Sequence, residues 1–552
     1  MTSKNCFPIS SHTLPFALKS RPSFTLQTSH FKLLEIFLIF VVFFLQGAWP
    51  VPDVNEAHYL SKALHFWNPS WCAGDLFLES SATHWAFYVS FGWLTLWFPL
   101  PVVAWIGRII TWLLLAWSWR RLSVTILPVR WWSIGTAILF GFLVEHCHMA
   151  GEWVIGGVEA KGFAFVLVFI GMERMIRQRW NSAWIAFGAA AMFHVLVGGW
   201  AVVAAFTAWF FCRREAKDSP LARPVTPLKK MLPGLVLGGF LSLPGLLPAL
   251  LMGRGASSEA VDFAHQLYVF VRLGHHLHPN LIQPEYVLRF TLLLIAWLLI
   301  RHFSPSTARL RLLHGFVAGS VLIAIVGVVI GIIAQNYPSL AASLLRFYWF
   351  RLSDIMIPVG VAIGGPTLFM SLRHTRPWLV RMMILTVVLI GTWHLGWYAS
   401  IRPFPMWGRF YSLRGDYYCW MEACKWIARS EEIPPDAVFL TPRQNQTFRW
   451  YAHRPEVVNW KDIPQDPESL KEWWDRMIDI HATGSSDPAY RWYPTLADQS
   501  PIRLQELGRR YGASYVITVS WPPLDLPLVY CNGDFSIYRL EEVKEKKNVP
   551  DN

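Results

Sequence analysis

LLEIFLIFVVFFLQGAWPVPDVNEAHYL, residues 33–60, joins a membrane-length apolar run to two carboxylates, Asp53 and Glu56. A helix over residues 33–49 would deliver both acids to the membrane surface. Acidic side chains there are costly unless they face water or a partner, so their position requires a reason. One reason is structural: Asp53 would cap a surface helix that starts near Asn55, with Glu56 in its first turn. The other is catalytic: a carboxylate would act as general base toward an acceptor hydroxyl.

The composition excludes an ordinary soluble protein. Of the 552 residues, 54% are hydrophobic and 15% are charged, whereas soluble domains carry about 25% charged residues. Repeated apolar runs between short basic segments predict a mainly α, polytopic membrane bundle. The net charge of +13 then reflects basic cytoplasmic loops, and no basic-aromatic motif indicates nucleic-acid binding. The seven cysteines form no close CxxC pair, which argues against a zinc site or a disulfide framework.

About eleven membrane helices are predicted, and one further apolar run is expected to lie flat. That run, residues 84–98, begins with His84 and is followed by Pro99 and Pro101, so we place it on the outer surface. The expected spans are residues 33–49, 104–119, 131–149, 154–172, 182–195, 197–212, 232–252, 288–301, 315–334, 352–371 and 380–399.

The distribution of basic residues orients the bundle. Arginine and lysine gather in the loops that this order of helices assigns to the cytoplasm, as the positive-inside rule requires. We therefore expect a multi-pass protein of the plasma (inner) membrane with a cytoplasmic, uncleaved N-terminal tail over residues 1–32. The transmembrane part would cover residues 33–402, and its acidic first outer loop residues 50–103.

Residues 403–552 differ in kind, because they are richer in charge and proline and contain no membrane-length apolar run. We expect them to form an extracytoplasmic α/β domain. Helices are predicted at 417–429, 469–481 and 502–511, and strands at 437–441, 514–519 and 535–540.

Three further groups of polar residues are expected at the outer face. Glu152, Glu159 and Lys161 would line a polar cavity, or lie in a solvated loop; His148 and Glu152, four apart, could also share a metal ion. The loop VRLGHHLHP contains His275, His276 and His278, which could bind metal or phosphate.

RFYWFRLSD, residues 346–354, supplies arginines that suit a lipid phosphate. Alternatively, Arg351 and Asp354 would form an ion pair one turn apart that holds the helix end.

The chain resembles the GT-C superfamily of membrane glycosyltransferases, which use lipid-linked sugar donors. The resemblance lies in NEAHYL (55–60), in HWAFYVSFGWLTLW (84–97) and in IGRIITWLLLAWSWRRL (106–122), followed by many helices and an outer α/β domain. Members commonly carry an Asp-Glu pair with a tyrosine three residues after the glutamate. Here the matching residues are Asn55, Glu56 and Tyr59, so that Asn55 departs from the acid. The chain is also similar to poorly described bacterial membrane proteins that share the VNE-HYL pattern.

The resemblance implies an inverting transfer from a polyprenyl-phosphate sugar at the outer face. Asp53 or Glu56 would take the acceptor proton, and Arg351 with Arg346 would stabilise the departing lipid phosphate. No cofactor is required with certainty, and a divalent metal is left open. The implied partners are the lipid-linked sugar and membrane lipid, with the acceptor open. Residues expected to line the cavity are Asn55, His58, Tyr59, Asp75, His84, Glu152, Glu159, Lys161, His275, His276 and Asp354.

Two other classes of function remain as alternatives. A lipid or small-molecule transporter or flippase would often show internal repeats and broken helices at the bilayer midplane. No repeat is evident, and the ionisable residues gather at the outer face instead. A non-catalytic scaffold of GT-C ancestry would explain Asn55 in place of an acid.

Overall fold

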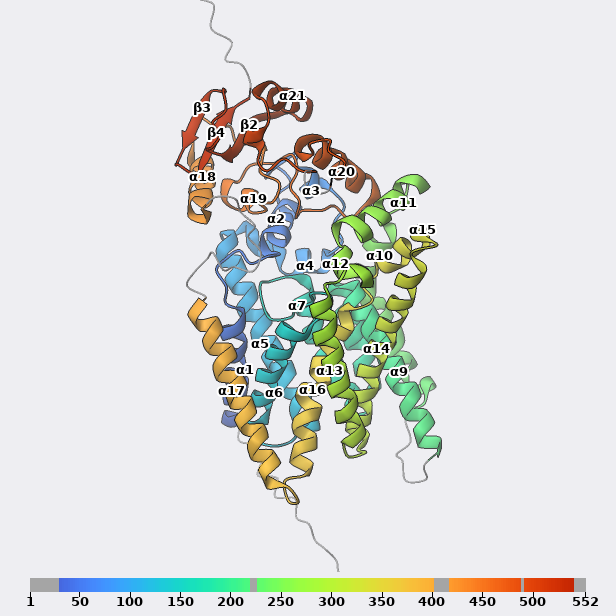
Figure 1. The fold of residues 1–552 in the computed structure, drawn as a ribbon. Helices are drawn as coiled ribbons and strands as arrows, with labels where there is room; N and C mark the ends of the chain where they lie inside the picture. Colours follow the sequence, from blue (N-terminus) through green and yellow to red (C-terminus); the bar gives the residue numbers. More distant parts are fainter. Residues whose placement is uncertain (1–28, 219–225, 402–415, 488–490, 541–552) are drawn as a thin grey trace, which may run out of the picture.

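A helical bundle carries a small α/β unit at one end, which we call the sheet end (Figure 1). The computed structural model describes residues 29–218, 226–401, 416–487 and 491–540, with the side chains of 29 and 214–218 excepted. Most of the N-terminal tail and the predicted boundary near residue 402 lie outside these ranges, so the proposed division into domains stays a prediction.

All eleven predicted helices are present in the described residues. Eight of them are long and apolar enough to cross a membrane, as expected for a multi-pass membrane protein, whereas α6, α7 and α8 are shorter. The eleven helices are α1 (Ser29–Gly47), α5 (Leu100–Ile126), α6 (Trp132–Cys147), α7 (Ala160–Ile176), α8 (Trp180–Phe193), α9 (Val195–Asp218), α10 (Leu228–Leu251), α13 (Pro284–Phe303), α14 (Ala308–Ile333), α16 (Arg351–Ser371) and α17 (Pro377–Ile401).

The bundle is apolar both inside and outside. Its core includes fully buried aromatic side chains such as Trp112, Trp119 and Phe165. Its periphery exposes large aliphatic side chains, for example Leu292 on α13 and Leu385 on α17. A helix that is hydrophobic all round belongs in a membrane or a large core, so the exposed apolar faces of α13 and α17 suit contact with lipid.

Short helices cover the sheet end. The run at 84–98 forms only the short helices α4 (Trp85–Ser90) and η1 (Gly92–Leu96), which confirms that it does not span the bundle. Trp93 and Trp97 on this run are exposed, as interfacial tryptophans are. The other short helices are α2 (Glu56–Trp67), α3 (Leu76–Glu79), α11 (Ser258–Gln266), η2 (Leu267–Arg272), α12 (Gly274–Leu277), η3 (Pro279–Leu281) and α15 (Pro338–Leu345).

The C-terminal unit, residues 416–540, is built on a four-stranded mixed sheet with the order β1-β2-β4-β3. β1 and β2 are parallel, and the other two pairs are antiparallel. The predicted helices and strands are present within a few residues, and the strand β3 was not predicted. The elements are α18 (Tyr417–Arg429), β1 (Val438–Leu440), α19 (Phe448–Ala452), α20 (Pro467–His481), η6 (Leu496–Asp498), α21 (Pro501–Tyr511), β2 (Ala513–Val519), β3 (Leu528–Cys531) and β4 (Phe535–Arg539).

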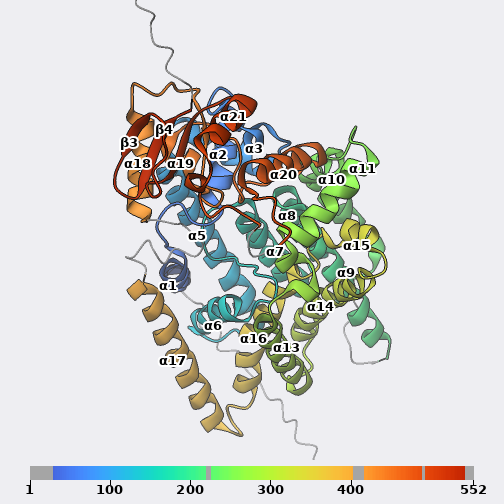
Figure 2. The same ribbon diagram turned by 45° about the horizontal axis from the view of Figure 1, so that its top comes forward.

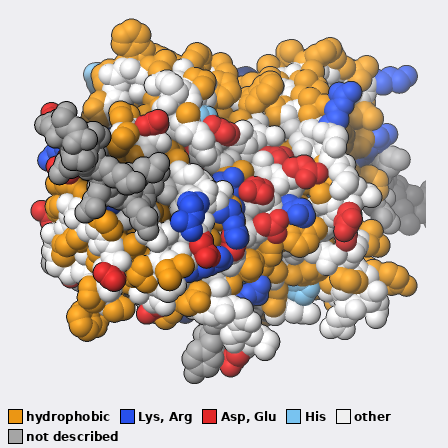
Figure 3. All heavy atoms as spheres, turned by 90° about the horizontal axis from the view of Figure 1, so that it is seen from above, with side chains coloured by type: hydrophobic (Ala, Val, Ile, Leu, Met, Phe, Trp, Pro, Cys, Tyr) orange, Lys and Arg blue, Asp and Glu red, His pale blue; other side chains and the backbone are white. Residues whose placement is uncertain are grey.

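The C-terminal unit and the first loop of the bundle share one hydrophobic core. Leu60 on α2, Phe87 on α4, and Trp420 and Phe448 of the C-terminal unit belong to the same buried cluster. Figure 1 shows α2 below α19, and Figure 2 shows α2 and α19 side by side between α18 and α20. Seen from above, charged side chains gather in the middle of the sheet end and apolar side chains form much of its rim (Figure 3). The loop that carries the candidate acids is thus covered by the C-terminal unit.

Candidate functional site

Glu56 begins α2 and is fully buried against Arg108 of α5. Arg108 donates from Nε to Oε1 at 2.7 Å and from Nη2 to Oε2 at 2.6 Å. The same carboxylate accepts backbone N–H groups of Asp53 and Val158, at 2.8 and 2.9 Å. Each oxygen of Glu56 therefore already has two donors. The geometry describes a structural ion pair more closely than an available proton acceptor.

Asp53 lies beside this pair but is held differently. Its Oδ1 accepts the N–H of Val54 at 2.8 Å, and its Oδ2 accepts the N–H of Gly157 at 2.9 Å. Among the described residues no cation pairs with it. It does not cap α2, because Asn55 occupies the N-cap position; the capping expectation is therefore wrong. Asp53 is the carboxylate of this segment that keeps lone pairs for a further donor.

Gly157 lets the chain before α7 approach both acids. A β-carbon at this position would lie 2.9 Å from Cβ of Asp53 and 2.9 Å from Cγ of Glu56, closer than real side chains pack. The approach places backbone N–H donors of Gly157 and Val158 on the two carboxylates. α7 starts at Ala160 and not at the predicted residue 154, because residues 154–157 form bends around the acids and Glu159 is extended.

A chain of alternating charges runs from α2 to the start of α16. Its contacts are Asn55 Nδ2 to Glu159 Oε2 at 2.8 Å, Glu159 Oε1 to Lys161 Nζ at 2.9 Å, Lys161 Nζ to Glu152 Oε1 at 3.1 Å and Glu152 Oε2 to Arg351 Nε at 2.8 Å. The predicted residues Asn55, Glu152, Glu159, Lys161 and Arg351 are thus joined. The predicted span 154–172 placed both Glu159 and Lys161 inside a helix; Lys161 does lie in the first turn of α7, whereas Glu159 is its N-cap, just before the helix.

Arg351 stands at the end of this chain, beside aromatic and histidine side chains. Its guanidinium lies 3.8 Å from the centre of the Tyr348 ring, and its Nη1 donates to Nε2 of His194 at 3.0 Å. The ring of His194 neighbours that of His84, whose Nε2 lies 3.2 Å from the hydroxyl of Tyr59. Tyr59 and His84 therefore lie near the chain of charges, and His194 was not predicted.

Asp354 is not the partner of Arg351, which corrects the ion pair that their spacing suggested. Its carboxylate accepts the N–H groups of Met149, Ala150 and Glu152, at 2.9, 2.9 and 3.4 Å. Asp354 thereby fixes the turn that carries Glu152. The spacing along α16 predicted the wrong partner, because the donors nearest to Asp354 are backbone N–H groups of the segment 149–152.

Arg346 is exposed and lies on the turn before α16. Its Nε donates to the carbonyl of Ser343 in the same turn, at 3.2 Å. Among the histidines of the 272–278 loop, Nδ1 of His276 lies 2.5 Å from the carbonyl oxygen of Ala150, and the rings of His275 and His276 are in contact. In the described residues no group of three or more His, Cys, Asp and Glu side chains is arranged to hold a metal ion.

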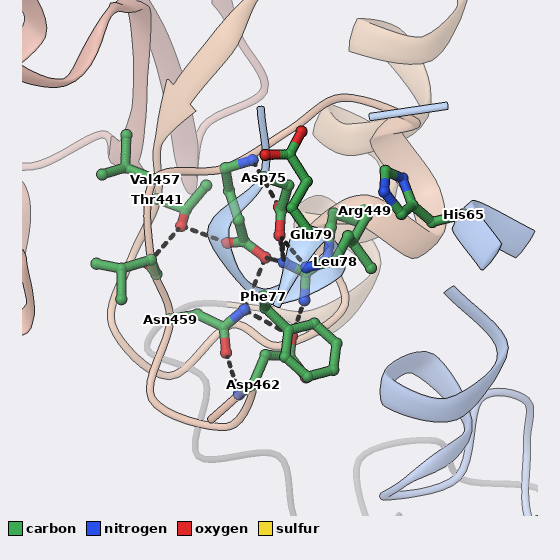
Figure 4. A network of polar contacts seen from close by, with 12 residues as sticks. His65, Asp75, Phe77, Leu78, Glu79, Thr441, Arg449, Val457, Asn459 and Asp462 are labelled. Atoms are coloured by element: carbon green, nitrogen blue, oxygen red, sulfur yellow. Dashed lines mark hydrogen bonds and ion pairs between the residues drawn. The ribbon is translucent and has the colours of Figure 1, made fainter. Parts of the chain in front are cut away.

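Asp75 belongs to a second polar network, which joins the first loop to the C-terminal unit (Figure 4). Both its oxygens accept Nη1 of Arg449, at 2.9 and 2.7 Å, and Nη2 of Arg449 bonds to Asp462. Glu456 accepts from Thr441 at 2.6 Å and from Asn459 at 2.7 Å. Burial raises the pKa of Glu456 to about 7, although the nearby Arg449 opposes the rise.

His58 connects this network to α2. Its Nδ1 lies 2.8 Å from Oδ1 of Asp462. Burial favours a raised pKa at Asp462, but Arg449 and His58 outweigh it and hold the pKa far below the ordinary value. Lys461, the neighbour of Asp462, has its pKa lowered to about 8 by burial and by Arg272.

Sequence reasoning missed Arg449, Asp462 and Lys461. The signal was present in RQNQTFRWYAHRPEVVNWKD, residues 443–462, a dense alternation of polar and aromatic residues in a segment without a clear helical or strand pattern.

The chain matches a protein family over part of its length and a solved structure over most of it. A family described as a domain of unknown function (DUF6798) matches residues 418–480, which include Arg449, Glu456 and Asp462 of the second polar network. No curated protein matches the chain. Among solved structures, the chain is similar to the crystal structure of ArnT from Cupriavidus metallidurans bound to undecaprenyl phosphate. The identity is 12% and the TM-score 0.44, over 93% of this chain and 98% of that chain.

Proposed function

We propose that this protein is an inverting membrane glycosyltransferase that moves a sugar from a polyprenyl-phosphate donor to an acceptor. The sheet end would face the outer side of the plasma membrane, and the N-terminus the cytoplasm. The opposite end of the bundle carries clusters of arginine, such as Arg120 and Arg121 in the last two turns of α5 and Arg174 in the last turn of α7, which the positive-inside rule places on the cytoplasmic side.

The observation that carries the proposal is the position of Arg351. It is the first residue of a membrane-length helix, and its side chain is nearly buried. Its Nε and Nη1 are engaged, while Nη2 has no hydrogen-bond partner among the described residues. A guanidinium with free donors at the level of the headgroups suits the phosphate of a lipid. Lys161 pairs with Glu152, the carboxylate that also binds Arg351, and so adds positive charge beside it.

Asp53 would be the general base. The donor's phosphate would lie against Arg351 and Lys161, and the acceptor hydroxyl would face Asp53. As the oxygen attacks the anomeric carbon, its proton passes to the carboxylate and the bond to the lipid phosphate breaks. The leaving phosphate gains negative charge, which the two cations stabilise. Glu56 would hold the loop in place without touching substrate.

The test uses purified protein with a panel of polyprenyl-phosphate sugars and reads release of the lipid phosphate. The wild type should release it with at least one donor. Asp53→Asn keeps an oxygen for the Gly157 N–H but removes the base, and we expect the rate of lipid-phosphate release to fall by about 100-fold or more. Arg351→Lys keeps the positive charge but loses the planar set of guanidinium donors, and a similar fall in the rate of release is expected.

Lys471→Ala, at an exposed pair with Asp475, is the control and should retain full activity. Full activity in the Asp53→Asn variant would refute the role of Asp53 as general base. A wild type that is inactive with every sugar donor tested would refute the proposed function. Uptake of substrate into vesicles by the same preparation, with no glycosyl product, would support the transporter instead.

A further inference from the structure

Among the described residues, no carboxylate contacts the buried guanidinium of Arg272. This arginine is the last residue of η2, and only 8% of its surface is exposed. Its Nε donates to the carbonyl of Trp460 at 2.9 Å, and its Nη2 lies 3.5 Å from the carbonyl oxygen of Lys461. Its Nη1 has no hydrogen-bond partner within the same described ranges. A charge buried without a counter-charge is energetically costly, so the position of Arg272 requires a reason.

Lys461 brings a second cation to the same place from the C-terminal unit. Its side chain is half-buried, and its ammonium group makes no hydrogen bond or ion pair in the part of the chain that the structure describes. Burial and the charge of Arg272 lower the pKa of Lys461 to about 8. Glu159 opposes this fall, but its carboxylate pairs with Lys161 at 2.9 Å. Since Arg272 also contacts the backbone of residues 460 and 461, the two cations meet where the bundle joins the C-terminal unit.

Asp462 is an acid whose charge acts on both cations, but its oxygens are bound elsewhere. Burial lowers the pKa of Arg272 and of Lys461, and the charge of Asp462 opposes this fall at both. Oδ1 of Asp462 lies 2.8 Å from Nδ1 of His58, and its Oδ2 binds Arg449. The carboxylate is thus oriented by other partners, and the two cations keep donors for a further anion.

A pair of tyrosines connects Arg272 with Arg351. Tyr268 precedes Arg272 by four residues in η2, and its hydroxyl lies 3.1 Å from that of Tyr348. The ring of Tyr348 in turn lies 3.8 Å from the guanidinium of Arg351. Burial raises the pKa of Tyr268, and the charges of Arg351 and Arg272 oppose the rise. Both arginines therefore lie near this tyrosine pair, at the same end of the bundle.

We propose that Arg272 and Lys461 form a second phosphate-binding site, separate from the one at Arg351. A phosphate monoester carries between one and two negative charges near pH 7, which matches two cations better than the single charge of a carboxylate does. The planar guanidinium suits phosphate oxygens, and the ammonium adds a point charge. Because one cation comes from the bundle and the other from the C-terminal unit, the site is complete only when these parts are docked.

The inference deepens the proposed function and rests on it for the identity of the ligand. A transferase of this kind offers two sources for a second phosphate: the acceptor, or the outer phosphate of a diphosphate-linked donor. Both present the same chemistry to Arg272 and Lys461, and the binding experiment separates them.

The test measures binding of inorganic phosphate to the purified full-length protein in detergent by calorimetry, with chloride holding the ionic strength constant. Arg351→Gln is the background, so that the donor site proposed at Arg351 does not contribute. Phosphate should still bind to this variant. Adding Arg272→Gln or Lys461→Gln should weaken the binding by about 10-fold or more, as expected for the loss of a hydrogen bond to a charged group.

The matched control is Arg254→Gln, which removes one exposed positive charge from the loop before α11; it should leave the affinity for phosphate unchanged. If Arg351→Gln does not accumulate, the comparison is made in the wild type, where Arg272→Gln should remove one of two phosphate sites.

Polyprenyl phosphate and polyprenyl diphosphate then identify the source. Weaker binding of the diphosphate alone in Arg272→Gln would assign the site to the donor, and weaker binding of inorganic phosphate with both lipids unaffected would assign it to the acceptor. Unchanged binding of inorganic phosphate in Arg272→Gln and Lys461→Gln, or equal weakening of both lipids, would overturn the second site while the transferase stands. A wild type that binds phosphate through Arg272 but transfers no sugar would refute the proposed function instead.

Discussion

Glu56 and Arg108 lie 52 residues apart in the chain and form a two-pronged ion pair in which both side chains are fully buried. Arg108 also donates to the carbonyl of Trp49, two residues after the end of α1. The pair thereby fixes the start of α2 against α5, and with it the position of Asp53. Glu56 thus supports the structure of the site, while Asp53 keeps lone pairs that can accept a further hydrogen bond.

The pair predicts opposite effects for the two acids. Glu56→Gln leaves the buried Arg108 without a counter-charge, which typically costs about 3–5 kcal/mol of stability. We expect the variant to unfold at a lower temperature in detergent, or to accumulate poorly. Asp53→Asn should unfold near the wild-type temperature. Equal unfolding temperatures for Glu56→Gln and wild type would show that the pair is not a structural support.

Asn55→Asp, which restores the acid common in the GT-C pattern, should harm this protein. Asn55 donates to Glu159 at 2.8 Å, and aspartate would instead place two carboxylates against each other. Repulsion at this distance in a partly buried site is on the order of a few kcal/mol. We expect a lower unfolding temperature and slower transfer, measured in the same detergent preparation.

The double variant Asn55→Asp with Glu159→Gln tests the reason for that loss. It reverses the donor and the acceptor of the hydrogen bond and keeps one negative charge. Recovery of stability relative to the single variant would confirm that charge repulsion is the cause. A double variant as unstable as Asn55→Asp alone would contradict it.

Arg449→Met should loosen the C-terminal unit from the first loop. The change leaves Asp75 and Asp462 buried without their shared cation, and the cost expected for such a break is about 3–5 kcal/mol. We expect a protease to cleave the variant faster between the C-terminal unit and the bundle, and the unfolding temperature to be lower than in wild type. Lys471→Ala, which removes an exposed pair, should leave the unfolding temperature unchanged.

Glu456 predicts a pH dependence of stability. Its pKa in the folded protein is about 7, above its ordinary value of 4.5, chiefly because of burial. The folded state therefore binds more protons than the unfolded state between these values, and stability falls as pH rises through this window. The loss is at most about 3 kcal/mol. Glu456→Gln, compared with wild type at pH 5 and pH 8, should remove this contribution; equal pH slopes in both proteins would refute it.

The order of helices could be predicted because each depends on a local pattern. A run such as residues 315–334 must be helical in a membrane, where its backbone groups have no water to bond. The helices α18, α20 and α21 were predicted from local signals for helix start and end. The start of α7 was predicted too early, because hydropathy does not register the bends at residues 154–157, where Gly157 lets the backbone approach the acids.

The candidate site was predictable as a set of residue types but not as a set of partners. Asn55, Glu152, Glu159, Lys161 and Arg351 were singled out from the sequence, and they are joined in one chain of contacts. The pairing of Arg351 with Asp354 was wrong, since spacing along one helix cannot anticipate donors from another segment.

The sequence by itself determined a multi-pass helical bundle with an α/β unit after it, because hydropathy and periodicity act over neighbouring residues. Only the tertiary structure decided which acid is bound in an ion pair, since Arg108 pairs with Glu56, whereas Asp53 accepts only backbone N–H groups. It also brought Asp462 to His58 across 404 residues. Such contacts depend on how surfaces pack, and no local pattern encodes the partner of a buried charge.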